Sequence, residues 1–98
     1  MSERDHGLDW FEATRYGDAV ASAFLTWCAE RRTALAAYQD AVLSSGHWPF
    51  ISARRRAEAK AAYEDELVQV EARHQKTKAE LWAREEERRE ARRREMAQ

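Results

Sequence analysis

The sequence predicts an all-α protein: an antiparallel helical hairpin whose second helix is long, charged and coiled-coil-like. Residues 52–97 contain no Gly or Pro and are rich in Ala, Glu, Arg and Lys, whose side chains lose little rotamer freedom in a helix. Residues 9–43 carry apolar side chains mostly three and four positions apart, the spacing of a helix with one apolar face. Only the short segment 44–51 separates the two stretches, and so short a connection favours antiparallel packing. Residues 1–98 are therefore expected to form a single helical domain.

The first helix is expected at residues 9–43. Residues 1–8 are expected to fray, and Asp9 suits the capping position because its carboxylate accepts hydrogen bonds from free backbone N–H groups. Gly17 followed by Asp18 is the only interruption, and Gly costs about 1 kcal/mol in a helix interior. Two interpretations fit this pattern: a single helix with at most a mild kink, or a short helix followed by a second start at Asp18. The apolar stripe keeps its phase across Gly17, which favours the single helix.

The segment 44–51 ends the first helix and precedes the second. Gly46 suits a helix C-cap in the left-handed conformation, and Pro49 cannot continue a helix because it lacks a backbone N–H. Ser52 is a good N-cap for the helix expected at residues 52–97.

Four tryptophans in 98 residues is a high number. Trp10 and Trp27 lie on the first apolar stripe and are expected in the core. Trp48 and Phe50 lie at the tip of the hairpin, where they either fold back over the core or form an exposed anchor for a partner; the first is favoured. Trp82 lies where the apolar pattern of the second helix ends, and the expected pairing of the helices places it against Trp10.

The second helix carries a heptad seam, because apolar and weakly polar side chains alternate at spacings of four and three. A two-helix unit rarely buries enough apolar surface alone, so the chain is expected to self-associate as a dimer through this seam. Residues 84–98 interleave basic and acidic side chains and are expected to form a solvated tail. The seam residues expected to mediate self-association are Tyr63, Leu67, Val70, His74 and Leu81.

The residues that carry catalysis or bind metal are not grouped in a recognisable motif. Cys28, His6, His47 and His74 do not have the spacing of metal ligands, and no Gly-rich phosphate loop or nucleophile motif is present. The sequence therefore predicts a protein that is not an enzyme and that has no catalytic residue, metal or cofactor.

Basic residues open the second helix at Arg54, Arg55 and Arg56. Positive charge at a helix N-terminus opposes the helix dipole, and a segment that costs local stability suggests a use such as gripping an acidic partner. The formal net charge is −1, and acidic residues dilute the other basic cluster in residues 84–98, so nucleic-acid binding through these arginines is the less favoured alternative.

A cytoplasmic, soluble protein without a membrane partner is expected. The single cysteine suits a reducing compartment, the polar start does not resemble a signal peptide, and no apolar run approaches the roughly 18 residues of a bilayer span.

The length, the two long helices and a central break containing Trp48 resemble the layout of the small WXG-type helical-hairpin proteins of type VII secretion. The turn in that family carries Trp-x-Gly, whereas here Gly46 precedes Trp48, and Pro49 follows it. The family's Tyr-x-x-x-Asp/Glu export signal is also missing, since Tyr63 is followed four residues later by Leu67. The resemblance is one of layout, and a type VII secretion-like hairpin protein is kept as an alternative.

The function expected from these features is that of a non-catalytic protein-interaction module. An adaptor, an assembly factor, or a small inhibitor of the kind that phages and mobile elements encode all fit a charged helical rod with several aromatic residues. Such a module occludes or bridges a protein partner with its helix faces. The residues expected to contact the partner are Trp48, Phe50, Arg54, Arg55, Arg56 and Trp82.

Overall fold

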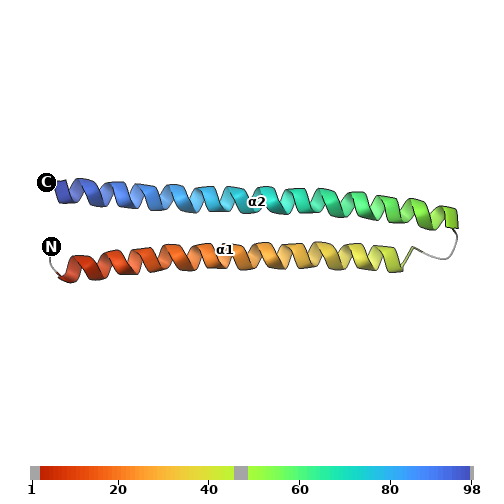
Figure 1. The fold of residues 1–98 in the computed structure, drawn as a ribbon, viewed down its shortest axis with the longest axis horizontal. Coiled ribbons are helices and arrows are strands. Elements are labelled where there is room, and N and C mark those ends of the chain that lie inside the picture. Colours follow the sequence, from red (N-terminus) through yellow and green to blue (C-terminus); the bar gives the residue numbers. More distant parts are fainter. Residues whose placement is uncertain (1–2, 46–48, 98) are drawn as a thin grey trace.

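The protein is a hairpin of two long antiparallel helices. The computed structural model describes residues 3–45 and 49–97, with side chains for 10, 13–45 and 52–97. Helix α1 spans Glu3–Leu43 and helix α2 spans Pro49–Ala97. The helices lie side by side along a molecule that is 74 Å long and 18 Å wide, with both chain ends at the same end of the hairpin (Figure 1). The prediction of an all-α helical hairpin is confirmed.

Helix α1 starts earlier than its capping pattern indicates and is not interrupted. It begins at Glu3, six residues before Asp9, and continues through Gly17 as one helix. A Cβ placed on Gly17 would have no neighbouring heavy atom within 4 Å. No contact with another described residue therefore requires Gly17, although glycine in a helix interior is less stable than alanine by roughly 0.5–1 kcal/mol.

Helix α2 also starts earlier, at Pro49 rather than after it. Proline fits the first position of a helix because its missing N–H would have no partner there in any case. Ser52 therefore lies within the helix and is not its N-cap. Its hydroxyl lies 3.3 Å from that of Ser45, which also donates to the Val42 carbonyl at 2.8 Å. Both serines are buried, and they close the hairpin beside the connection.

Pairs of rings join the two helices along their length. The pairs are Tyr38 with Tyr63 at 5.1 Å between centroids, Trp27 with His74 at 5.2 Å, and Tyr16 with Trp82 at 6.2 Å. The three members from α1 recur every eleven residues. Eleven residues make about three turns of an almost unsupercoiled helix, so residues eleven apart lie on the same side. This repeat lets two nearly straight helices stay in contact over many turns.

The register differs from the expected pairing at the open end. Trp82 contacts Tyr16 rather than Trp10. Trp10 is 65% exposed, so the expectation that it lies in the core is wrong. The shift is already present at the turn, where Ser45 rather than Leu43 lies beside Ser52, so the helices pair closer to the connection than the sequence indicated.

The C-terminal part of α2 is not a wholly solvated tail. Glu85 is only 4% exposed, against the expectation for residues 84–98. A seven-residue repeat counted from Tyr63 reaches Arg84 after three heptads. A helix of 3.6 residues per turn drifts by about 20° per heptad relative to that repeat. Over three heptads the drift turns Arg84 away from α1 and brings Glu85 to face it. Trp82, three residues before Glu85, contacts Tyr16, so this part of α2 lies against α1.

The hairpin has a line of contact rather than an interior. Among the residues whose side chains are described, the buried apolar ones are Ala34 and Val70, and Val70 is 1% exposed. Two helices share one interface, so apolar side chains on their other sides have no cover. The exposed large apolar residues are Trp10, Phe24, Leu25, Leu35, Leu43, Val68, Trp82 and Met96.

Candidate functional site

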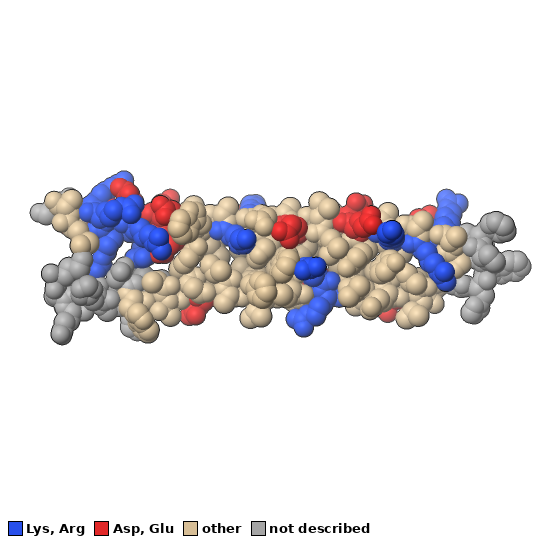
Figure 2. Space-filling view, viewed as in Figure 1, with Lys and Arg blue, Asp and Glu red and all other residues tan. Residues whose placement is uncertain are grey.

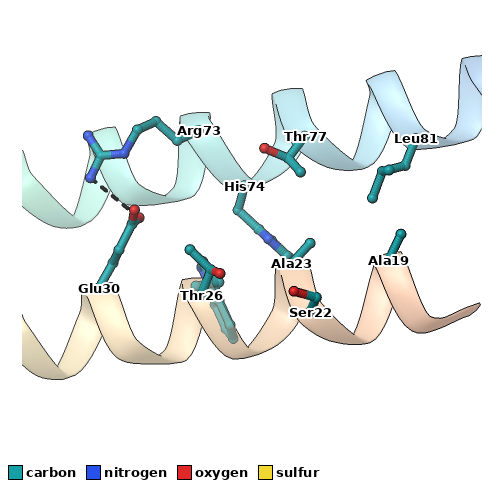
Figure 3. Close-up of a pocket in the computed structure, with 10 residues that line it drawn as sticks. Ala19, Ser22, Ala23, Thr26, Glu30, Arg73, His74, Thr77 and Leu81 are labelled. Carbon is teal, nitrogen blue, oxygen red and sulfur yellow. Dashed lines mark hydrogen bonds and ion pairs between the residues drawn. The ribbon is translucent and has the colours of Figure 1, made fainter.

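A shallow groove runs along one side of the line where the helices meet. It consists of three adjoining depressions: the first two share Thr26 and Glu30, and the second and third share Ala34, Ala37 and Glu66. Figure 3 shows the first depression, about 320 Å³ in volume, with its lining side chains between α1 and α2. We call this surface the alanine groove; its small residues include Ala19, Ala23, Ala34 and Ala37 of α1 and Ala59 and Ala62 of α2.

One basic side chain bridges the alanine groove. Arg73 Nη2 of α2 lies 3.4 Å from Glu30 Oε2 of α1 and 3.2 Å from Glu66 Oε1 of its own helix (Figure 3 shows the pair with Glu30). The hydrogen bond to Glu66 raises the pKa of the Arg73 guanidinium above its usual value. All three side chains are substantially exposed, and ion pairs in water contribute little to stability.

The opposite side of the contact line carries large side chains. Val70 faces α1, and at about 100° per residue Glu71 and Arg73 turn to opposite sides of it. Glu71 Oε2 accepts a hydrogen bond of 3.0 Å from Trp27 Nε1, whereas Arg73 spans the groove. We call the side of Glu71 the aromatic face; it comprises Phe24, Trp27, Cys28, Arg31 and Leu35 of α1 with Glu71 and Trp82 of α2. Trp27 lies on the line of contact and also lines the first depression of the alanine groove.

Trp27 is the centre of the aromatic face. Its ring lies 5.7 Å from that of Phe24, and the Arg31 guanidinium lies 4.6 Å from its centroid, within the range of a cation–π contact. Its indole N–H donates to Glu71, which also accepts a 2.9 Å hydrogen bond from Gln75. The hydrogen bond from Gln75, followed by that from Trp27, lowers the pKa of Glu71, so this carboxylate stays ionised at neutral pH.

Apolar groups of the aromatic face remain open to solvent. Phe24 is 51% exposed, and Leu35, eleven residues later on the same side, is also exposed. Cys28 is half-buried and lines a shallow depression with Arg32, Leu35 and Tyr63. Trp82 is 47% exposed, although Tyr16 and the Arg89 guanidinium, 5.4 Å from its centroid, cover part of the ring.

Charged side chains are distributed along the whole rod, and basic ones gather at both ends of α2. Figure 2 shows one broad side of the hairpin, on which basic side chains gather over both ends of α2, while acidic side chains of α2 and a basic one of α1 lie over the middle. At the C-terminal end, Glu85 accepts hydrogen bonds from Arg88 at 2.7 Å and Arg89 at 3.1 Å. The bond from Arg88, together with that from Arg89, lowers the pKa of Glu85.

The partner contacts expected from the sequence are separated along the hairpin. Trp48 lies outside the described residues; Phe50 belongs to the first turn of α2, but its side chain is not described. The Arg54 side chain is 84% exposed and pairs with Glu58 at 3.2 Å. Arg55 and Arg56 are exposed and form no ion pair with a described residue. Trp82 lies 26 residues after Arg56 on the same helix, which corresponds to about 39 Å at 1.5 Å per residue.

The heptad seam expected to mediate self-association lies between the two helices of one chain. Tyr63 and His74 stack on rings of α1, Leu81 lines the alanine groove, and Val70 is buried. Leu67 is half-buried in the same row. These five side chains therefore hold the hairpin together.

Sequence reasoning missed Phe24 and Leu35 as surface residues because the spacing of the first stripe predicts one apolar face and does not divide it into rows. The signal was present: the stripe is broader than one neighbouring helix can cover. Residues at intervals of eleven from Tyr16 face α2, while Phe24 and Leu35 form a second row beside them.

The described residues offer no arrangement for metal chemistry: no three His, Cys, Asp or Glu side chains among them are placed to hold an ion. Over the part of the chain that is described, neither helix has an apolar stretch of the length and hydropathy that crossing a bilayer requires. Comparison of the chain with protein-family models, with curated proteins and with solved structures gives no match. The surfaces of the hairpin are therefore the basis for a functional proposal.

Proposed function

We propose that this chain is a non-catalytic protein-interaction module of the cytoplasm, which binds a protein partner through its helix faces. The proposal rests on the exposure of large apolar side chains beside the line where the two helices meet. Ala34 and Val70 are buried, whereas Phe24, Leu35 and Trp82 lie exposed beside the same line of contact. Contiguous exposed apolar surface on a protein marks an interaction site, and aromatic residues commonly dominate the binding energy of such sites.

The mechanism follows from the shape. The hairpin is 74 Å long, and its aromatic face forms a surface along one side of it. Phe24, Trp27 and Leu35 lie near the middle of this surface, and Trp82 lies further along it. A partner helix laid against this surface would bury the apolar side chains and would meet Glu71 and Arg31 as polar contacts. Such binding blocks a partner's own surface or bridges two partners, which suits an adaptor, an assembly factor or a small inhibitor.

A photo-crosslinking experiment tests the proposal. The photoreactive amino acid p-benzoylphenylalanine replaces Phe24 in one variant and Ala36, which is exposed and turned away from the aromatic face, in the matched control. Irradiation in extract of the native host is expected to link the first variant to a discrete polypeptide, and excess unlabelled wild-type chain should compete. The proposal fails if Phe24 gives no product, or only the products that Ala36 gives.

The loop anchor is a separate part of the same proposal. Changing Trp48 and Phe50 together to Ala is expected to weaken partner capture while the helical circular-dichroism signal is unchanged. Unchanged capture would remove the hairpin tip from the proposed contact surface.

Nucleic acid is the second candidate partner, and the exposed side chains of Arg54, Arg55 and Arg56 are the observation in its favour. Glu58 already pairs with Arg54, and the formal net charge is −1, which weakens attraction to phosphates. A gel-shift assay at low salt tests this candidate: a complex that disappears steeply with salt supports it, and no complex removes it.

A further inference from the structure

Gly17 and Ala21 are two small residues on the side of α1 that carries the aromatic face, and we call the surface they form the notch. Gly17 lies eleven residues before Cys28, and Ala21 seven before it, so both turn to the same side of the helix. No heavy atom lies within 4 Å of a Cβ placed on Gly17. Glycine is unfavourable in a helix interior, and no side chain of another described residue occupies the space where its Cβ would lie. A glycine at this position is explained if a group from outside the chain packs closely against it.

The protein itself carries a side chain of suitable size at the same height. Trp82 contacts Tyr16, the residue directly before Gly17, so notch and indole lie level along the hairpin. The indole does not fill the notch of its own chain, because the space beside Gly17 is open, and it remains 47% exposed. A large apolar projection and a gap of small residues thus occur side by side, one on each helix.

Residues of opposite charge on the two helices also lie at the same height along the hairpin. Arg31 lies over Trp27, which donates to Glu71, so the basic pair Arg31 and Arg32 of α1 is level with Glu71 of α2. Glu64, seven residues before Glu71, lies on the same side of α2. Arg32 and Glu64 form no ion pair with a described residue. Figure 2 shows such an arrangement, with a basic side chain over the middle of α1 and acidic ones over α2.

We propose that a second copy of this chain covers the aromatic face, related by a two-fold axis parallel to the long axis of the hairpin. Such a rotation keeps every residue at its height and exchanges the two helices, so α1 of each copy lies against α2 of the other. The partner's Trp82 then enters the notch at Gly17 and Ala21, and the partner's Glu71 lies opposite Arg32. The result is a four-helix bundle in which each helix is antiparallel to its neighbours. The inference rests on the proposed interaction function and names its partner.

A two-fold axis across the long axis gives a poorer fit. It lays α1 on the partner's α1, and centring it on the apolar stretch from Phe24 to Leu35 brings Arg31 and Arg32 of the two copies together. Like charges placed opposite each other across an interface disfavour association. With the parallel axis, the basic residues of α1 in each copy instead lie opposite acidic residues of α2 in the other copy.

Charge reversal with recovery by mixing tests the arrangement. The purified full chain is expected to sediment as a dimer. The variant Arg31→Glu with Arg32→Glu, and the variant Glu64→Arg with Glu71→Arg, should each dimerise at least 10-fold more weakly, because each places like charges opposite one another. An equimolar mixture should form a heterodimer about as tight as wild type, since its opposed residues differ in sign. That recovery also shows that both variants fold.

Gly17 supplies a second test in which the two effects have opposite signs. Gly17→Gln is expected to raise the thermal stability of the dilute hairpin, because glycine is replaced by a better helix former in open space. The same change should weaken dimerisation at least 10-fold by filling the notch. Ala36→Gln, on the outer side of α1, should leave dimerisation unchanged.

The outcomes separate this inference from the function on which it rests. A wild-type chain that stays monomeric at high micromolar concentration overturns the second copy as occupant, and the crosslinking at Phe24 then decides independently whether another protein binds. A dimer that tolerates Arg31→Glu with Arg32→Glu, or that tolerates Gly17→Gln, overturns the proposed axis. Failure of the mixture to recover association also overturns it.

Discussion

The alanine groove and the aromatic face border the same line of helix contact, yet they differ in the size of their side chains. In the groove, Ala34 and Ala37 leave shallow depressions, and Arg73 closes part of the gap with carboxylates. On the aromatic face, Phe24 and Leu35 extend into solvent. Small residues expose little apolar area when they have no partner, whereas large ones expose much. Burial against a partner would therefore remove more apolar area from water on the aromatic face than in the alanine groove.

The largest expected effect concerns the contact line that both faces share. Val70→Ala should lower the free energy of unfolding by roughly 2 kcal/mol, because it removes buried methyl groups and leaves a gap between the helices. Val68→Ala is the matched control, since Val68 is 69% exposed in the same helix. Thermal and urea unfolding followed by circular dichroism, at one chain concentration, measure both. Equal losses would contradict a single contact line.

The next effect tests whether the alanine groove is open space. Ala34→Leu should destabilise the hairpin by about 1 to 3 kcal/mol, because the larger side chain overfills a buried position. Ala37→Leu, three residues along in the same groove, should change stability little, because Ala37 is exposed. Urea unfolding of both variants gives the comparison. A cost at Ala37 as large as that at Ala34 would mean that the groove is closed in solution.

A smaller effect is expected at the open end of the hairpin. Glu85→Gln should cost about 1 kcal/mol at neutral pH, because a buried carboxylate loses its charge-assisted bonds to Arg88 and Arg89. Folding lowers the pKa of Glu85, so its contribution is fully present above the ordinary glutamate value of about 4.3 and is lost as pH falls through the lowered pKa. The difference from wild type should therefore shrink below about pH 4.

The matched control for this charge is Glu90. It also has a lowered pKa, through its hydrogen bond with Arg93, but both side chains are about half exposed or more. Glu90→Gln should give no measurable loss at neutral pH, since exposed ion pairs contribute little. Urea unfolding across a pH series measures both variants. A loss at Glu90 equal to that at Glu85 would show that burial does not distinguish the two sites.

The smallest effect is expected at the bridge across the alanine groove. Arg73→Met keeps much of the side-chain length and removes the ion pairs with Glu30 and Glu66. Because these groups are exposed, stability should fall only slightly at low ionic strength, and the difference should vanish in concentrated salt. Melting temperatures at two salt concentrations check this. A large loss that salt does not reduce would make the bridge part of the core.

The candidate site was only partly predictable from the sequence. The apolar pattern indicated that the chain requires a neighbour, and it placed Trp82 where the apolar pattern of the second helix ends. It did not separate Phe24 and Leu35 from the side chains that face α2, because all lie on one broad stripe. The rotation of α1 about its own axis, which places Tyr16, Trp27 and Tyr38 against α2, decides which row of that stripe is covered.

The sequence by itself determined two long helices and one turn, because helix-forming composition, apolar spacing and a short break are local properties of the chain. Only the tertiary structure decided that Glu85 is buried, that Trp10 is exposed and that the heptad seam closes the hairpin within one chain. Those outcomes depend on how far a helix of 3.6 residues per turn drifts from a seven-residue pattern over nearly fifty residues. A small angular drift, summed along so long a rod, moves a side chain from one face to the next.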